Sequence, residues 1–115
     1  MTQLEFEEFL GQTHNRLLAL TRTKGVEYAG SRDQLANFRR LSETLGLPPE
    51  AILLVYLTKH LDSIHSYVRG LTGGTPSALS EPIQGRIDDA LLYLILLRAM
   101  TRDDTVCRAL SDEDQ

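Results

Sequence analysis

The chain has 115 residues, one cysteine, no tryptophan and a formal net charge of −4. This length suits one domain and is too short for two ordinary ones. One cysteine cannot form an internal disulfide, so a disulfide-stapled secreted fold is excluded and a reducing, cytoplasmic setting is expected. The longest apolar runs fall far short of the ~18–20 residues of a membrane span, and the acidic balance argues against a binder of duplex nucleic acid.

Arginine predominates among the basic residues: of the twelve lysines and arginines, only Lys24 and Lys59 are lysines. The planar guanidinium of arginine suits bidentate recognition of phosphate or carboxylate. An anionic small ligand is therefore compatible with an acidic total charge.

A first helix is predicted over residues 3–24, where apolar side chains recur at helical spacing. Thr2 and Glu5 fit a capping box that would begin it. Gly25 is a suitable stop, and residues 26–33 are typical of a loop because they contain a Gly-Ser breaker.

A second helix is predicted over residues 34–45, with Asp33 as its N-cap and Gly46 just past its end. Two prolines then break the chain, and Pro49 suits the first turn of a third helix over residues 49–69.

The third helix is strongly apolar at its beginning, over residues 51–57, and its pattern continues through Leu61, Ile64 and Val68. A helix that is apolar on more than one side is expected to be buried on more than one side. In so small a chain this favours a homo-oligomer.

Residues 70–80 form a predicted linker rich in Gly, Ser and Thr. Ser80 would cap a fourth helix that runs to about Met100. A short fifth helix is predicted to begin at Thr101, which forms a capping-box pattern with Asp104. The apolar residues expected to be buried on the fourth helix are Ile83, Ile87, Ala90, Leu91, Leu94, Ile95 and Leu97.

The predicted fold class is all-α, an antiparallel helical bundle of four main helices plus a short C-terminal helix. It would form a single domain over residues 1–110, followed by an acidic tail over residues 111–115.

Polar residues interrupt two of the apolar helices. Lys59 and His60 lie on the third helix, and His60 falls on or beside its buried stripe. On the fourth helix Asp88 and Asp89 follow Glu81 by seven and eight residues, so each falls within ~80° of Glu81 around the axis. Carboxylates crowded in apolar surroundings repel one another unless a cation or base offsets their charge.

Two interpretations of this pattern remain open. Each residue has an ordinary structural role, such as a helix-surface ion pair between Arg86 and Asp89. Taken together, the carboxylates of one helix facing His60 and Lys59 of the other favour a site for Mg²⁺ (or Mn²⁺) and phosphates, because Mg²⁺ prefers carboxylate and phosphate oxygens. Tyr93, four residues after Asp89, is a candidate ligand contact.

Three segments carry a resemblance to a known family: KGVEYAGSRDQLANF (24–38), YLTKHLDSI (56–64) and SEPIQGRIDDALLYLILL (80–97). Their order resembles that in small phage and prophage proteins related to the MazG-like all-α nucleotide pyrophosphohydrolases and the phage nucleotide-modification-associated domains. This resemblance implies a four-helix core assembled as a dimer or tetramer, with Mg²⁺ on helix-borne carboxylates. It also implies cleavage of a nucleoside triphosphate to a monophosphate and pyrophosphate.

By this resemblance, Glu81 and Asp89 match the acidic pair of the last core helix, and Lys59 and His60 match a basic dipeptide. Two further positions in the first block match as well: Glu27, an acidic residue of the loop, and Asn37, a contact to base or sugar. The chain lacks the paired-glutamate E-E-x-x-E motif in its core and the E-x-x-D spacing of the MazG-type enzymes.

Three functions remain open at this point. The first is Mg²⁺-dependent hydrolysis of a nucleotide, with Glu81, Asp88 or Asp89 holding the metal and His60 or a carboxylate activating water. In that case the developing charge would be neutralised by Lys59, Arg86 and Arg39. The second function is non-catalytic binding of a nucleotide or other phosphorylated small molecule, as a ligand sponge or regulator. The third is a helical interaction module with a buried polar network.

Overall fold

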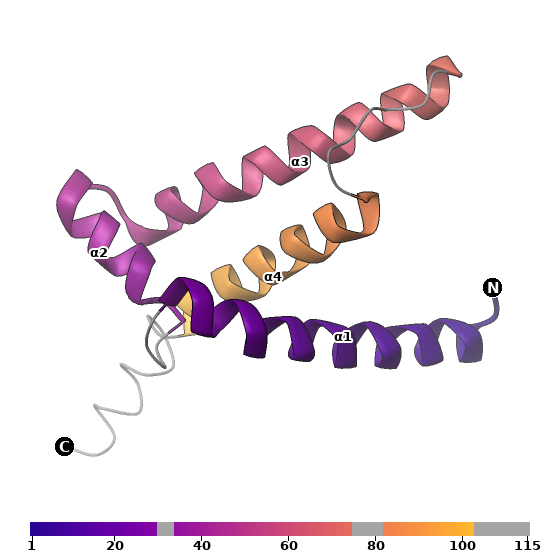
Figure 1. Ribbon diagram of the computed structural model, residues 1–115, viewed down its shortest axis with the longest axis horizontal. Helices are drawn as coiled ribbons and strands as arrows, with labels where there is room; N and C mark the ends of the chain where they lie inside the picture. The colour runs from indigo at the N-terminus through magenta and orange to yellow at the C-terminus, as the bar shows by residue number, and fades with distance from the viewer. Residues whose placement is uncertain (30–33, 75–81, 103–115) are drawn as a thin grey trace. The chain divides into compact units, whose positions relative to one another are not determined.

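The computed structural model describes residues 1–29, 34–74 and 82–102, with the backbone alone over 24–29. Four α-helices follow one another: α1 (Gln3–Ala29), α2 (Ala36–Leu45), α3 (Pro49–Gly73) and α4 (Ile83–Arg102) (Figure 1). No strand occurs in these three ranges, and the prediction of an all-α class is confirmed.

The chain divides into two compact units, Met1–Ala36 and Asn37–Gln115. The first holds α1, and the second holds α2, α3 and α4. Within the second unit α3 and α4 pack against each other, and the last turns of α3 extend past the beginning of α4 (Figure 1).

The capping box at the beginning of α1 is confirmed. The backbone N–H of Glu5 donates to Thr2 Oγ1 over 3.1 Å, and the N–H of Thr2 donates to Glu5 Oε2 over 3.2 Å. The prediction that Gly25 ends this helix is wrong, because α1 continues to Ala29. A glycine in a helix interior costs only ~1 kcal/mol, which the continuing backbone hydrogen bonds offset. The predicted loop therefore loses its first residues, and 30–33 lie outside the described chain.

The junction between α2 and α3 follows the prediction. Gly46 has a φ of 69°, and the N–H groups of Gly46 and Leu47 both donate to the carbonyl of Ser42. A left-handed residue after a helix satisfies the last carbonyls in this way, and glycine adopts it without a Cβ penalty. Pro48 is the N-cap of α3 and Pro49 lies in its first turn, where a missing N–H is tolerated.

Two predicted helix ends are wrong. The third helix extends past residue 69 to Gly73, and Gly74, with a φ of 72°, is the residue that caps it. Thr101 does not begin a fifth helix, because it lies inside α4 and its hydroxyl donates to the carbonyl of Arg98. The predicted cap Ser80 and the rest of the predicted fifth helix lie outside the described residues.

The core of the second unit is made of apolar side chains from α2, α3 and α4. Leu53 is fully buried, and Ile52, Leu57, Ala90 and Met100 are nearly so. Several residues predicted to be buried are instead exposed: Leu54 and Val55 on α3, and Ile87, Leu94 and Ile95 on α4. A pair of packed helices covers only the facing stripes, so apolar residues on the outer stripes stay at the surface of a single chain.

None of the four helices in the described ranges combines the length and the apolar character needed to cross a membrane.

Candidate functional site

His60 of α3 and Asp89 of α4 meet where the two helices pack. The Nδ1 atom of His60 lies 3.9 Å from Asp89 Oδ2, and the two side chains are only 15% and 16% exposed. The separation exceeds a hydrogen bond and lies within ion-pair range. A histidine beside a carboxylate is held in one orientation and can accept or deliver a proton near neutral pH. Two of the sequence-predicted site residues are thus brought together.

An aromatic group surrounds this pair. The ring of Tyr93 on α4 stacks on the imidazole of His60, with centroids 5.4 Å apart and planes 27° apart. Tyr93 also stacks on Tyr56 of α3, with ring centroids 6.1 Å apart and planes 6° apart. It lies edge-on to Phe38 of α2, with centroids 6.4 Å apart. Phe38 is also edge-on to Tyr56. These are the offset and T-shaped geometries that aromatic rings prefer.

Helical spacing explains why these side chains interleave. Tyr56 and His60 are four residues apart on α3, and Asp89 and Tyr93 are four apart on α4. Residues at this spacing lie on the same face of a helix, one turn apart. Tyr56 contacts Tyr93, and His60 contacts both Tyr93 and Asp89. Moving from Tyr56 to His60, toward the C-terminus of α3, therefore shifts the contact from Tyr93 to Asp89, toward the N-terminus of α4.

Asp88 and Arg86 lie on α4 close in sequence to Asp89. Asp88 is buried, and so is the Nε atom of Arg86. Adjacent helical positions are ~100° apart, so Asp88 and Asp89 point in different directions and Asp89 is the one that meets His60. The use of both carboxylates on one ligand stays a prediction.

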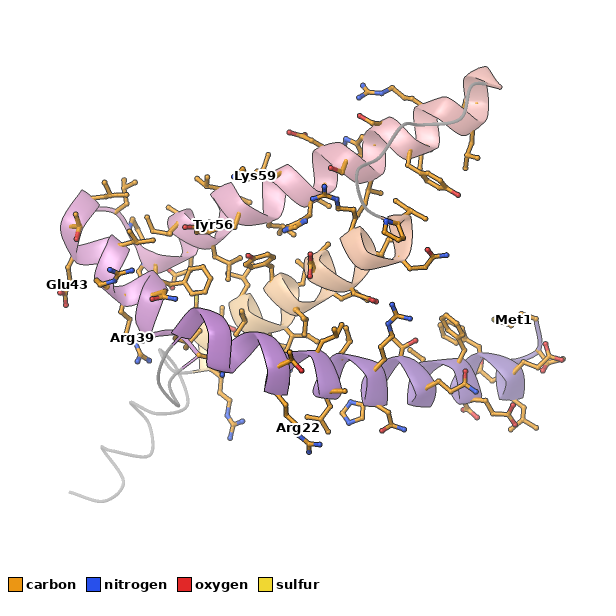
Figure 2. All side chains as sticks on the ribbon, in the orientation of Figure 1. Met1, Arg22, Arg39, Glu43, Tyr56 and Lys59 are labelled. Atoms are coloured by element: carbon orange, nitrogen blue, oxygen red, sulfur yellow. The ribbon has the colours of Figure 1, made fainter. Side chains whose placement is uncertain are left out.

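The other predicted ligand contacts lie away from this pair or outside the description. Lys59 and Arg39 are both exposed (Figure 2). Asn37 is half-buried on α2, and its Oδ1 accepts a hydrogen bond from Arg40 Nη2 over 3.5 Å. Glu27 lies within the backbone of α1, not in a loop as predicted, and Glu81 is outside the described residues.

The described residues were considered for a group of side chains that could hold a metal ion. Within ranges 1–29, 34–74 and 82–102, no three His, Cys, Asp or Glu side chains come together in a way that would hold an ion. The predicted Mg²⁺ site also includes Glu81, whose position lies outside those ranges. Mg²⁺ is commonly held by one or two carboxylates together with substrate phosphates, so Glu81, Asp88 and Asp89 stay its predicted donors.

The contribution of Phe38 and Tyr56 to this cluster was missed by the sequence interpretation. A usable signal existed in the equal four-residue spacing of Tyr56 with His60 and of Asp89 with Tyr93. Equal spacings on two packed helices indicate that their side chains alternate across the contact.

Comparisons of the chain with protein-family models, with curated proteins and with solved structures found no match.

Proposed function

We propose that this protein binds and hydrolyses a nucleotide or another phosphorylated small molecule, with His60 as the general base. The observation that supports this proposal is the contact of His60 with Asp89 and Tyr93 between α3 and α4. A positioned histidine is the commonest general base in proteins, and a neighbouring carboxylate stabilises the imidazolium that forms when it takes a proton.

The proposal gives each ring nitrogen of His60 its own role. Nδ1 faces Asp89, so Nε2 is the atom that would take a proton from an attacking water molecule. The stacked ring of Tyr93 limits rotation of the imidazole plane. The 3.9 Å separation from Asp89 is long for a hydrogen bond, and catalytic hydrogen bonds of this kind commonly tighten when substrate binds.

The phosphates of the substrate need positive charge. Arg86 on α4, three residues before Asp89, is the nearest arginine in sequence to the pair, and its guanidinium suits bidentate phosphate binding. Exposed Arg39 and Lys59 would attract the anion from solvent. Mg²⁺ or Mn²⁺, when bound, would neutralise phosphate charge, with Glu81 as the further predicted ligand.

A second candidate function is binding without hydrolysis. It is favoured by the sequence of the core, which lacks the E-E-x-x-E motif of the MazG-type enzymes. The same aromatic and basic residues would then hold a nucleotide as a sponge or regulator. The predictions of an antiparallel four-helix bundle, a homo-oligomer and a cytoplasmic location belong with this proposal.

One experiment separates these functions. The protein is incubated with a panel of nucleoside triphosphates, with Mg²⁺, with Mn²⁺ or with a chelator. Pyrophosphate and phosphate release are measured beside equilibrium binding of each nucleotide. Turnover supports hydrolysis, and stoichiometric recovery of intact bound nucleotide supports the sponge. Neither turnover nor binding would refute both functions and leave the polar cluster as a structural network.

Two variants test the roles of individual residues. His60→Gln and Asp89→Asn remove the base and its partner with little change of volume, and we expect turnover to fall by about 10²-fold or more. His14→Gln on α1 and Glu43→Gln on α2 are matched controls, because both residues are exposed (Figure 2 labels Glu43). Equal turnover in His60→Gln and His14→Gln would refute the assignment of His60, provided that circular dichroism shows both variants folded.

A further inference from the structure

The outer side of α3 carries a continuous exposed stripe, which we call the α3 seam. Its members recur at alternating spacings of four and three residues, which is the heptad pattern of coiled-coil interfaces. All of them are exposed: Leu54, Thr58, Leu61, His65, Val68 and Thr72. None of the six seam residues is Asp, Glu, Lys or Arg.

The polar groups of the two threonines are already satisfied within the helix. The hydroxyl of Thr58 donates to the carbonyl of Leu54 over 2.7 Å, and that of Thr72 donates to the carbonyl of Val68 over 3.2 Å. These hydroxyls therefore need no partner from outside, and the threonines can present their methyl groups. The α3 seam is more apolar than its composition alone indicates.

The second half of the α3 seam extends beyond α4. His60 meets Asp89, and Tyr56 meets Tyr93, so the first residue of α4, Ile83, falls opposite position 66 of α3. The last two turns of α3 pass this point (Figure 1), with Val68 51% exposed and Leu71 63% exposed. An apolar stripe on a projecting helix end is typical of an association surface.

Charges beside the α3 seam indicate what covers it. Asp62 and Arg69 both follow a seam residue directly, so they flank the same edge of the seam one heptad apart. Asp62 forms no hydrogen bond or ion pair with another described residue, and Arg69 donates only a long 3.5 Å bond to Ser66. When two copies of α3 run antiparallel along their seams, Asp62 of each copy lies opposite Arg69 of the other, so opposite charges meet.

We infer that a second copy of this chain covers the α3 seam, with its own α3 antiparallel. In the register that pairs the charges, Leu61 faces Thr72 of the partner subunit and His65 faces Val68 of the partner subunit. Asp62 then meets Arg69 of the partner subunit, and two-fold symmetry repeats each contact. The overlap spans positions 61–72, which include the end of α3 that projects past α4 beyond position 66, and it leaves Leu54 outside. This inference does not depend on the proposed hydrolysis.

Charge reversal tests the inference directly. The mass of the full chain is measured by light scattering and sedimentation at a series of micromolar concentrations. We expect a dimer for the wild type, and self-association weakened by about tenfold or more in Arg69→Asp, which places acid opposite Asp62. The double variant Asp62→Arg with Arg69→Asp swaps both charges and is expected to restore the dimer.

Two further variants test the register. Leu61→Lys places a charge inside the overlap and should give a monomer, whereas Leu54→Lys, on the same seam outside the overlap, should leave the dimer intact. Circular dichroism confirms that each variant is folded, and Arg22→Asp on α1 (Figure 2) is the matched charge-reversal control. A monomeric wild type, a dimer insensitive to Arg69→Asp, or failure of the double variant to restore the dimer would overturn the inference.

Discussion

Two adjacent leucines of α3 provide the sharpest test of how this helix packs. Leu53 is fully buried, whereas its neighbour Leu54 is 55% exposed. Both lie in the helix interior, so truncation to alanine changes the same number of atoms in the same backbone setting. Any difference between Leu53→Ala and Leu54→Ala therefore reports burial rather than helix propensity.

The expected magnitude follows from the burial of each side chain. Truncating Leu53 removes its branched end from the core, which at about 0.8 kcal/mol per methylene-sized group costs about 2.4 kcal/mol. The cavity left behind adds to this, so a total of about 2–5 kcal/mol is expected. Leu54→Ala loses little buried area and gains helix propensity, so its free energy of unfolding should change by no more than about 0.5 kcal/mol.

Urea unfolding followed by circular dichroism measures both values, and thermal unfolding gives an independent check. A loss of about 3 kcal/mol lowers the melting temperature by roughly 12–24 °C for a unit of this size. Equal destabilisation by the two substitutions would refute the assigned orientation of α3, as would a loss below about 1 kcal/mol for Leu53→Ala.

Three further predictions concern single contacts. Tyr93→Phe should keep the ring stack on His60 and change unfolding free energy little, whereas Tyr93→Leu should cost about 0.5–1.5 kcal/mol for each lost ring pair, measured by urea unfolding. Gly46→Ala should destabilise by about 1–2 kcal/mol because φ is 69°, whereas Gly11→Ala, in open space within α1, should stabilise by about 0.5–1 kcal/mol; the opposite order of melting temperatures would contradict this. Thr2→Ala removes the capping-box hydroxyl, which should cost about 0.5–2 kcal/mol and speed amide exchange at Glu5, with Thr23→Ala as the control.

Much of the secondary structure was predictable because local signals decide it. The capping box at Thr2 and Glu5, the left-handed Gly46 and the proline at the beginning of α3 each act within one turn of the chain. Where the prediction failed, at Gly25 and at residues 70–73, a glycine was taken as a stop although a helix interior tolerates it. Only Gly46 and Gly74, with positive φ, mark helix ends in the described chain.

The candidate site was predictable in part. His60, Asp89 and Tyr93 were named from polar interruptions of apolar helices, and His60 does contact both Asp89 and Tyr93. Asp88 was grouped with Asp89 because both fall within ~80° of Glu81 around the helix axis, but the two are themselves ~100° apart. Phe38 and Tyr56 were missed because their contribution depends on the packing of three helices.

The sequence by itself determined the all-α class, the helix ends at Thr2, Gly46 and Pro49, and the helix periodicity of this protein, since these depend on interactions within a few residues along the chain. Only the tertiary structure decided which stripe of α3 faces α4 and which remains exposed. The third helix is apolar on two sides, so its composition is compatible with either side facing inward. The stacking of Tyr93 between Tyr56 and His60, and the exposure of Leu54, Leu61 and Val68, follow from that one choice of orientation.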